Sequence, residues 1–334
     1  MQVRVFGQSG ESRFPFEKSG PWKNFKSRLE ELNYEVVGSD QGGSEAVIAN
    51  FHSRSILQYM KQNQIPRHRR TLIIWEPWVV DAVRYRSEVL EQYGTVLAPS
   101  VIWSERTGAK SFHWPQDKMC DFDAFESWKS REDQVVMIQS NKFSARRGEM
   151  YSLRRQVMSK IKAGDAQLIG RDWNKGYSYD LLQWGKSLLA SRPNEVSFRS
   201  PSGAGHRYSN YMGVVEDKNL ALRQFKISLV IENSLDYVSE KLFDSVNAGC
   251  VTIYIGPSLD QFGIETAPLW NIPPKKNEIL EAISTLIKLN NKDLFELAIL
   301  QKKQLSKVWN EWENNKVLTE LADLAVEDFP NSDS

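Results

Sequence analysis

Short apolar runs alternate with amphipathic stretches over the first third of the chain. The apolar runs predict strands at 2–6, 34–37, 46–51, 71–75 and 95–98. Between them, apolar residues recur at helical spacing, which predicts helices at 22–32, 53–62 and 79–92. Strands that alternate with helices in this way are typical of a parallel sheet covered on both faces.

This alternation is interrupted at 115–134, where the residues are polar and charged, and then begins again. Further strands are predicted at 134–138, 166–169, 196–198 and 227–231, and further helices at 147–161, 177–189 and 216–224. After Pro257 the pattern is helical, with helices predicted at 276–289, 292–312 and 317–326. We therefore expect two Rossmann-like domains, 1–125 and 126–334, that face each other across a ligand-binding cleft. The C-terminal end is helical, and its last helix is a candidate to return to the first domain.

Composition and charge narrow the function classes. The chain has 334 residues and a net charge of +1, without the basic excess that nucleic-acid binding requires, so nucleic acid is not an expected partner. Its two cysteines cannot build a disulfide scaffold, and its four histidines lack metal-ligand spacing. The first residues are too polar for a secretory signal, and no apolar run approaches the ~20 residues of a membrane span. We expect a soluble, cytoplasmic protein without a transmembrane segment; peripheral contact with a membrane surface stays open.

The most informative segment is 224–257, which has the pattern of a buried strand, a polar loop, an amphipathic helix and a second buried strand. Asp236 is the expected N-cap of the helix, and Gly249 marks its end. Parallel α/β folds bind ligands where their strands end, and a helix N-terminus suits a phosphate group. At this place Lys241 offers a positive charge and Glu240 an acceptor for ribose hydroxyls. The alternative is an ordinary surface ion pair.

Residues 225–242, with Glu-Asn-Ser at 232–234 and Asp-Tyr-Val-Ser-Glu-Lys-Leu at 236–242, closely resemble the signature of the α-1,3/4-fucosyltransferases, glycosyltransferase family 10. The likeness continues at 248–251 and at Gly256, and 211–218 resembles bacterial members. The family has the GT-B architecture of two facing Rossmann-like domains. The resemblance implies that the C-terminal domain binds GDP-fucose and that the N-terminal domain binds the acceptor.

The resemblance also assigns roles to five residues of this segment. Tyr237 and Lys241 would contact the diphosphate of the donor, and Glu240 the ribose. Asn233 would lie at the same pocket and help to position the donor, with Ser234 as a further candidate.

A family arginine that contacts the diphosphate lies in a Ser-Asn…Arg…Tyr segment. The matching segment here is 140–147, followed by Tyr151. Its spacing favours Arg147 as the donor-binding residue, with Arg146 as the second candidate. An arginine suits this role because its planar fork can hold two phosphate oxygens at once. The alternative is a surface arginine at the start of a helix.

One carboxylate of the N-terminal half carries a candidate catalytic role. Glu76 follows the apolar run 72–75 and therefore stands at the carboxyl end of a predicted strand. Family members carry a glutamate after a comparable strand as the general base, and the resemblance assigns this role to Glu76. Asp81 is a weaker rival, and a loop glutamate that only solvates the turn is the alternative. Tryptophans such as Trp78 and Trp103 are candidates to stack on acceptor sugars, although core or inter-helix packing is the favoured interpretation for any one of them.

These assignments predict an inverting glycosyltransferase that moves L-fucose from GDP-β-L-fucose to a hydroxyl of an oligosaccharide or lipid-linked glycan, with no metal and no other cofactor. Only Leu235 separates Ser234 from Asp236, whereas many family members have a longer insert there. Another GDP-deoxysugar is therefore an alternative donor. A non-catalytic glycan- or nucleotide-binding protein on the same scaffold is a further alternative. A dehydrogenase is disfavoured, because no Gly-X-Gly-X-X-Gly follows the first strand of either half.

Overall fold

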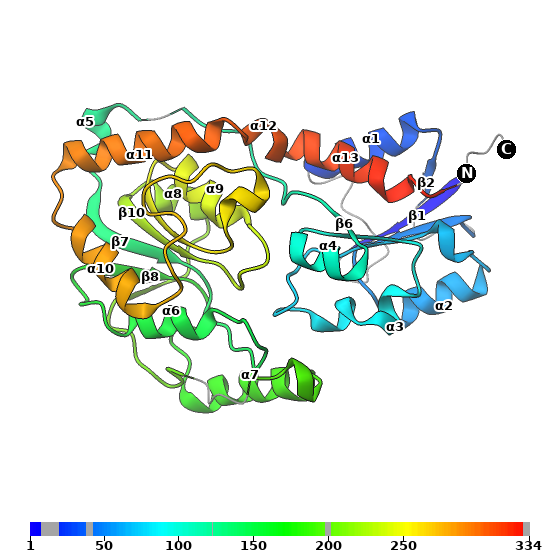
Figure 1. Ribbon diagram of the computed structural model, residues 1–334, viewed down its shortest axis with the longest axis horizontal. Coiled ribbons are helices and arrows are strands. Elements are labelled where there is room, and N and C mark those ends of the chain that lie inside the picture. The colour runs from blue at the N-terminus through cyan, green and yellow to red at the C-terminus, as the bar shows by residue number, and fades with distance from the viewer. Residues whose placement is uncertain (8–19, 38–42, 122, 198–201, 330–334) are drawn as a thin grey trace. The chain divides into compact units, whose positions relative to one another are not determined.

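The computed structural model describes residues 1–7, 20–37, 43–121, 123–197 and 202–329 (Figure 1). The chain forms two compact units, Met1–Asp117 with Asn310–Ser334, and Lys118–Trp309. Each unit is built on a sheet whose described strands pair in parallel. The predicted class of two Rossmann-like units with a helical C-terminal end is confirmed.

The first unit has a six-stranded sheet in the order β2-β1-β3-β4-β5-β6. Its strands are β1 (Gln2–Phe6), β2 (Glu35–Val37), β3 (Ala46–Ala49), β4 (Arg70–Ile73), β5 (Thr95–Ala98) and β6 (Lys110–Ser111). Its helices are α1 (Gly20–Glu31), η1 (Arg67–Arg69), α2 (Arg54–Gln62), η2 (Ala82–Tyr85), α3 (Ser87–Leu90), α4 (Val101–Thr107) and α13 (Asn314–Val326).

Strand β3 shows why this sheet is covered on both faces. Its four residues are all buried and alternate between two apolar clusters, as successive strand side chains must. Ile48 packs in the cluster that contains Phe25 of α1 and Leu321 of α13. Val47 packs in the opposite cluster, with Ile56 of α2. Helix α13, from the end of the chain, therefore belongs to the core of the first unit.

The predicted helix at 79–92 is wrong as a continuous element. The structure has a short 3₁₀ turn, η2, and the single-turn helix α3 in its place. Arg86 lies between them in an extended conformation with φ −79° and ψ 141°, which interrupts the helical hydrogen bonds. Strand β6 had no sequence signal because it is only two residues long.

The second unit has a five-stranded sheet in the order β11-β10-β7-β8-β9. Its strands are β7 (Glu132–Ile138), β8 (Ala166–Ile169), β9 (Tyr211–Gly213), β10 (Phe225–Ile231) and β11 (Val251–Ile255). Its helices are α5 (Phe125–Trp128), α6 (Tyr151–Met158), α7 (Tyr177–Leu189), η3 (Pro193–Glu195), α8 (Lys218–Leu222), α9 (Glu240–Asn247), η4 (Leu259–Phe262), α10 (Lys276–Leu286) and α11 (Asn291–Ser306), with α12 (Trp309–Trp312) at the boundary between the units.

Two predictions in this unit need correction. The predicted strand at 196–198 is not a strand in its described part: Val196 forms an isolated antiparallel bridge with Arg146, and residue 198 lies outside the described residues. The predicted helix at 292–312 is divided into α11 and α12 by a turn. Strand β9 was missed because it is a short edge strand with a half-exposed, irregular pattern rather than an apolar run.

Strand β10 leads into the polar loop that precedes α9. All seven of its residues are buried, and it pairs with β11 on one side and β7 on the other. Ile227 and Ser228 of β10 are each in register with one residue of β11 and one of β7. Because the three strands are parallel, their carboxyl ends meet at one edge of the sheet, where the loop to α9 begins.

Candidate functional site

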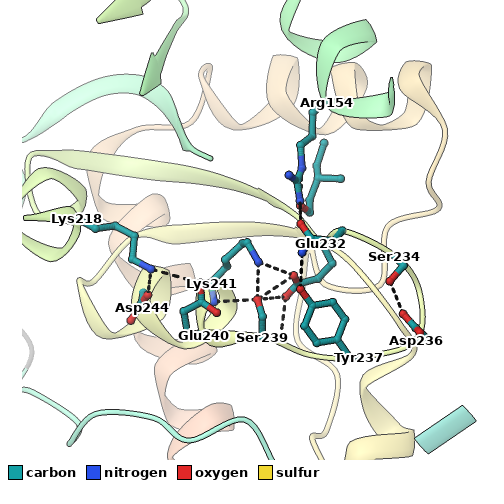
Figure 2. A network of polar contacts seen from close by, with 12 residues as sticks. Arg154, Lys218, Glu232, Ser234, Asp236, Tyr237, Ser239, Glu240, Lys241 and Asp244 are labelled. Atoms are coloured by element: carbon teal, nitrogen blue, oxygen red, sulfur yellow. Dashed lines mark hydrogen bonds and ion pairs between the residues drawn. The ribbon is translucent and has the colours of Figure 1, made fainter. Parts of the chain in front are cut away.

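A buried carboxylate follows the last residue of β10. The side chain of Glu232 is 0% exposed, and its oxygens accept hydrogen bonds from the Ser239 amide at 3.0 Å and the Ser239 hydroxyl at 2.8 Å (Figure 2). Lys241 Nζ donates a further hydrogen bond at 3.0 Å. A carboxylate removed from water is costly unless charged or polar donors surround it, as they do here. Glu232 therefore fixes the loop and the first turn of α9 to the end of β10.

The same contacts decide where α9 begins. Its N-cap is Ser239, whose hydroxyl accepts a hydrogen bond from the Lys241 amide at 3.3 Å. The prediction of Asp236 as N-cap is wrong. The Ser239 amide donates its hydrogen bond to Glu232, and the helix begins only after Ser239, three residues beyond Asp236. Asp236 instead accepts a hydrogen bond from Ser234, at the far end of the loop from Lys241 in Figure 2. The predicted helix stop is confirmed at Gly249, which has φ +84° directly after the C-cap.

Lys241 combines a positive charge with a helix N-terminus. Its ammonium group contacts Glu232 and also donates to the Ser239 hydroxyl at 2.8 Å, while 17% of the side chain stays exposed. The ammonium lies 5.9 Å from the centre of the Tyr237 ring. These contacts orient Lys241 without removing it from solvent, so an anion at the start of α9 can share its charge.

Glu240 is kept ionised by two lysines. Lys218 of α8 contacts Asp244 and lies 3.7 Å from Glu240. Burial alone would raise the pKa of Glu240, but the positive charges of Lys241 and Lys218 outweigh it and leave the pKa below its usual value. Burial likewise acts to lower the pKa of Lys218, and Asp244 and Glu240 more than reverse this. Glu240 is therefore a hydrogen-bond acceptor at neutral pH, as contact with hydroxyl groups requires.

Asn233 and Tyr237 form the other side of the loop. The Asn233 side-chain amide donates to the Tyr237 hydroxyl at 2.7 Å, and its side-chain oxygen accepts from Arg154 Nη2 at 2.9 Å. The Asn233 carbonyl accepts from the Met150 amide at 2.9 Å, just before α6. Both predicted residues are thus buried and connect the loop to α6.

Arg154 is a residue of this site that the sequence reasoning missed. It is 2% exposed, and its hydrogen bonds go to uncharged oxygens, including the Ile231 carbonyl at 3.0 Å from Nε (Figure 2). Burial lowers the pKa of its guanidinium group, partly offset by Tyr151 and Glu232. A sequence signal did exist: at helical spacing, Arg154 falls on the same face of α6 as the buried Val157 and Met158.

We expect Arg154→Met to lower the free energy of unfolding by about 3 kcal/mol, because it leaves the Ile231 carbonyl and the Asn233 side-chain oxygen without their donor. Urea unfolding of the whole chain measures this change. Arg147→Met is the matched control, since Arg147 is exposed and surface substitutions usually change stability by within about 0.5 kcal/mol. Equal losses in the two variants would show that Arg154 does not hold the loop.

A buried polar side chain without hydrogen-bond partners lies just after the end of β7. Gln139 is 6% exposed, and neither the nitrogen nor the oxygen of its side-chain amide has a hydrogen-bond partner in the described part of the chain. It borders a small, partly open pocket of about 10 Å³ that Lys218, Lys241 and Asp244 also line. A buried amide without partners is unusual and marks a place where a small polar group can bind. No pattern of residues around Gln139 marks it as a candidate.

The two arginine candidates have different surroundings. Arg147 is exposed, and its Nε donates to the Val196 carbonyl at 2.9 Å. Arg146 is buried, donates from Nε to the Ser191 hydroxyl at 3.1 Å, and borders a polar pocket of about 130 Å³. The residues that line this pocket are Ser144, Arg146, Gly148, Glu149, Ser152, Arg155, Gln156, Trp184, Ser197 and Ser202. The pocket shares no residue with the Glu232–Lys241 network.

The candidate base Glu76 belongs to the first unit, three residues after β4. It is partly exposed, and its backbone carbonyl accepts a hydrogen bond from the Tyr85 hydroxyl at 2.9 Å. The rival Asp81 forms an ion pair with Arg84 at 2.9 Å. Trp78 and Trp103 stack with 5.7 Å between ring centres and are partly buried against the core.

The described residues contain neither a membrane-spanning helix nor a cluster of metal-ligating side chains. No helix there is long and apolar enough to cross a membrane. Likewise, no three histidine, cysteine or acidic side chains of the described chain gather as a possible metal site. Asp123 forms ion pairs with Arg131 and Arg223 at 2.5 and 3.6 Å.

The chain was compared with known proteins. No protein-family model and no curated protein matches it. Among solved structures, it is similar to Anabaena Alr3699/HepE in complex with UDP and glucose, with a TM-score of 0.55, 9% identity and coverage of 97% of this chain and 98% of that one. An α1,3-fucosyltransferase gives a TM-score of 0.54 at 12% identity, over 97% and 89% of the two chains. An α-glucosyltransferase in complex with UDP-glucose and DNA containing an abasic site gives 0.55 at 9% identity, over 98% and 99%.

The fold is GT-B. At identities of 9–12% the likeness concerns the fold and not the substrate. Function must therefore be argued from the residues at the carboxyl end of β10.

Proposed function

We propose that this chain is an inverting glycosyltransferase that uses GDP-L-fucose as donor. The observation that carries the proposal is the group formed by Glu232, Ser239 and Lys241 at the N-terminus of α9. It places a fixed cation at the N-terminus of a helix, where the helix dipole also favours an anion such as a diphosphate. This group lies within the segment whose sequence resembles the family 10 fucosyltransferases.

Residues of the loop after β10, of the start of α9 and of the segment before α6 have proposed roles in donor binding. Lys241 and Tyr237 contact the diphosphate, and the ionised Glu240 accepts hydrogen bonds from the ribose. Asn233 positions Tyr237 through their mutual hydrogen bond. Arg147 supplies a further charge to the diphosphate, with Arg146 as the second candidate and Ser234 as a further donor-binding candidate.

The proposed reaction is a single displacement. Glu76 removes the proton from an acceptor hydroxyl, and the oxygen attacks the anomeric carbon as its bond to the β-phosphate breaks. Inversion converts the β-linked donor into an α-linked fucoside of an oligosaccharide or lipid-linked glycan, and GDP leaves. Negative charge grows on the β-phosphate during this step, and Lys241 with the helix N-terminus stabilises it. The proposed reaction uses no metal and no other cofactor.

A nucleotide screen tests the donor class. We expect GDP to raise the thermal midpoint of the chain more than UDP, ADP or NAD does at the same concentration, because a ligand stabilises the folded state that binds it. Selective stabilisation by UDP, or by none of the four, would contradict the proposed donor.

A panel of GDP-sugars with mass detection of the products then separates the remaining alternatives. Fucose on the acceptor supports the proposal. Transfer from another GDP-deoxysugar alone favours the alternative suggested by the short loop, in which Ser234 and Asp236 are held together. Binding of GDP without turnover of any sugar identifies a binding protein.

A further inference from the structure

Helix α7 exposes an apolar face. It forms part of the periphery of the second unit, outside α6 in Figure 1. Along its length Tyr177, Leu181, Leu182 and Leu189 have exposed fractions of 60%, 40%, 54% and 89%. At 100° per residue these four side chains fall on one side of the helix. An exposed set of large apolar side chains on one helix calls for a binding partner.

The inward side of α7 makes polar contacts beside Trp184, which lines the pocket that Arg146 also borders. Asp180 is its only buried residue, and its carboxylate accepts a hydrogen bond from the Gly205 amide at 2.8 Å. The Ser187 hydroxyl accepts one from the Ala145 amide at 3.0 Å. Polar contacts thus help to attach the helix to its own unit, and its exposed leucines, Leu181, Leu182 and Leu189, do not serve the core.

The exposed charges in the segment that contains α7 are of one sign. Between residues 171 and 197, all of which the structure describes, every exposed charged side chain is basic. These are Arg171, Lys175, Lys186 and Arg192. The acidic side chains of the same stretch are buried or half-buried: Asp172, Asp180 and Glu195. An apolar helix face bordered by lysine and arginine is the combination that binds the interface of an anionic lipid bilayer.

We propose that α7 docks this chain on a membrane surface that carries anionic lipids. Leu181, Leu182 and Leu189 enter the boundary between headgroups and acyl chains, and the basic side chains pair with lipid phosphates. This inference is independent of the proposed transfer reaction, because its observations lie outside the Glu232–Lys241 network. A protein partner or a second copy of this chain is less consistent with charges of a single sign.

Vesicle sedimentation with the whole chain tests the proposal. We expect binding to vesicles of phosphatidylcholine with phosphatidylserine, little binding to phosphatidylcholine alone, and weaker binding as salt screens the charges. The double variant Leu182→Glu/Leu189→Glu should bind at least about tenfold more weakly, because it places two negative charges on the docking face. Lys186→Gln should weaken binding about fivefold, the loss of one basic contact.

A matched pair of substitutions on another helix is the control. Ile299 and Leu300 of α11 are 42% and 41% exposed, so Ile299→Glu/Leu300→Glu makes the same change in charge elsewhere. This control should bind vesicles as the parent chain does, and thermal melting should show both double variants folded, since every altered position is exposed. Equal weakening by the two double variants, or no binding of the parent chain to anionic vesicles, would overturn the proposal.

The size of the particle in solution tests the remaining alternative, in which a second copy of this chain covers α7. If α7 instead pairs with a second copy, light scattering will show a dimer that Leu182→Glu/Leu189→Glu dissociates, and vesicles will not bind the parent chain. That result would replace the membrane by a dimer interface.

Discussion

Glu76→Gln is expected to lower kcat for fucosyl transfer by about 10²–10⁴-fold, the usual contribution of a general base. Glutamine keeps the size and polarity of the side chain but cannot take the proton of the acceptor hydroxyl. The backbone contact from Tyr85 goes to the Glu76 carbonyl and is preserved. Calorimetry with GDP should give an unchanged affinity, because the proposed donor residues all lie in the second unit.

The control for this variant is Asp81→Asn, a carboxylate-to-amide change in the same segment. Asp81 is held by Arg84, so its loss should affect stability slightly and transfer little. A Glu76→Gln enzyme with parental kcat would remove Glu76 from the mechanism. An equal loss of kcat in both variants would point to a general effect of negative charge instead of proton transfer by one residue.

Most strands of the two units were predictable because they lie in uninterrupted apolar runs. The seven buried residues of β10 and the four of β3 leave few alternatives to a strand covered on both faces. Strands with weaker patterns were not predicted: β6 is two residues long, and β9 is an edge strand with an exposed Met212. The prediction of one helix over 79–92 is wrong because apolar spacing does not show that the backbone of Arg86 is extended.

The candidate site was predictable by position but not by internal contacts. The sequence located the polar loop after β10 and selected Lys241, Glu240 and Tyr237 within it. It did not identify Glu232 as the buried centre, because its partners lie seven and nine residues later and no spacing rule defines this contact. Arg154 comes from a different element altogether. Its contact with Asn233 depends on how α6 packs against β10, which only the tertiary structure gives.

Lys241→Met is expected to have two effects that arise from two roles of the ammonium group. The first is a loss of stability of about 3 kcal/mol, because Glu232 remains buried without its cation. The second is a loss of GDP affinity of about 10- to 100-fold, since a charge-assisted hydrogen bond contributes about 1.5–3 kcal/mol. Urea unfolding measures the first effect and calorimetry with GDP the second.

A double variant separates these roles. Glu232→Gln removes the buried negative charge, and the glutamine side chain can still accept from the Ser239 amide and hydroxyl. In Glu232→Gln/Lys241→Met no unpaired charge remains, so most of the lost stability should return. The affinity for GDP should stay low, because the diphosphate still lacks its cation. If affinity instead recovers together with stability, Lys241 acts only by holding the loop, and the proposed diphosphate site loses its principal charge.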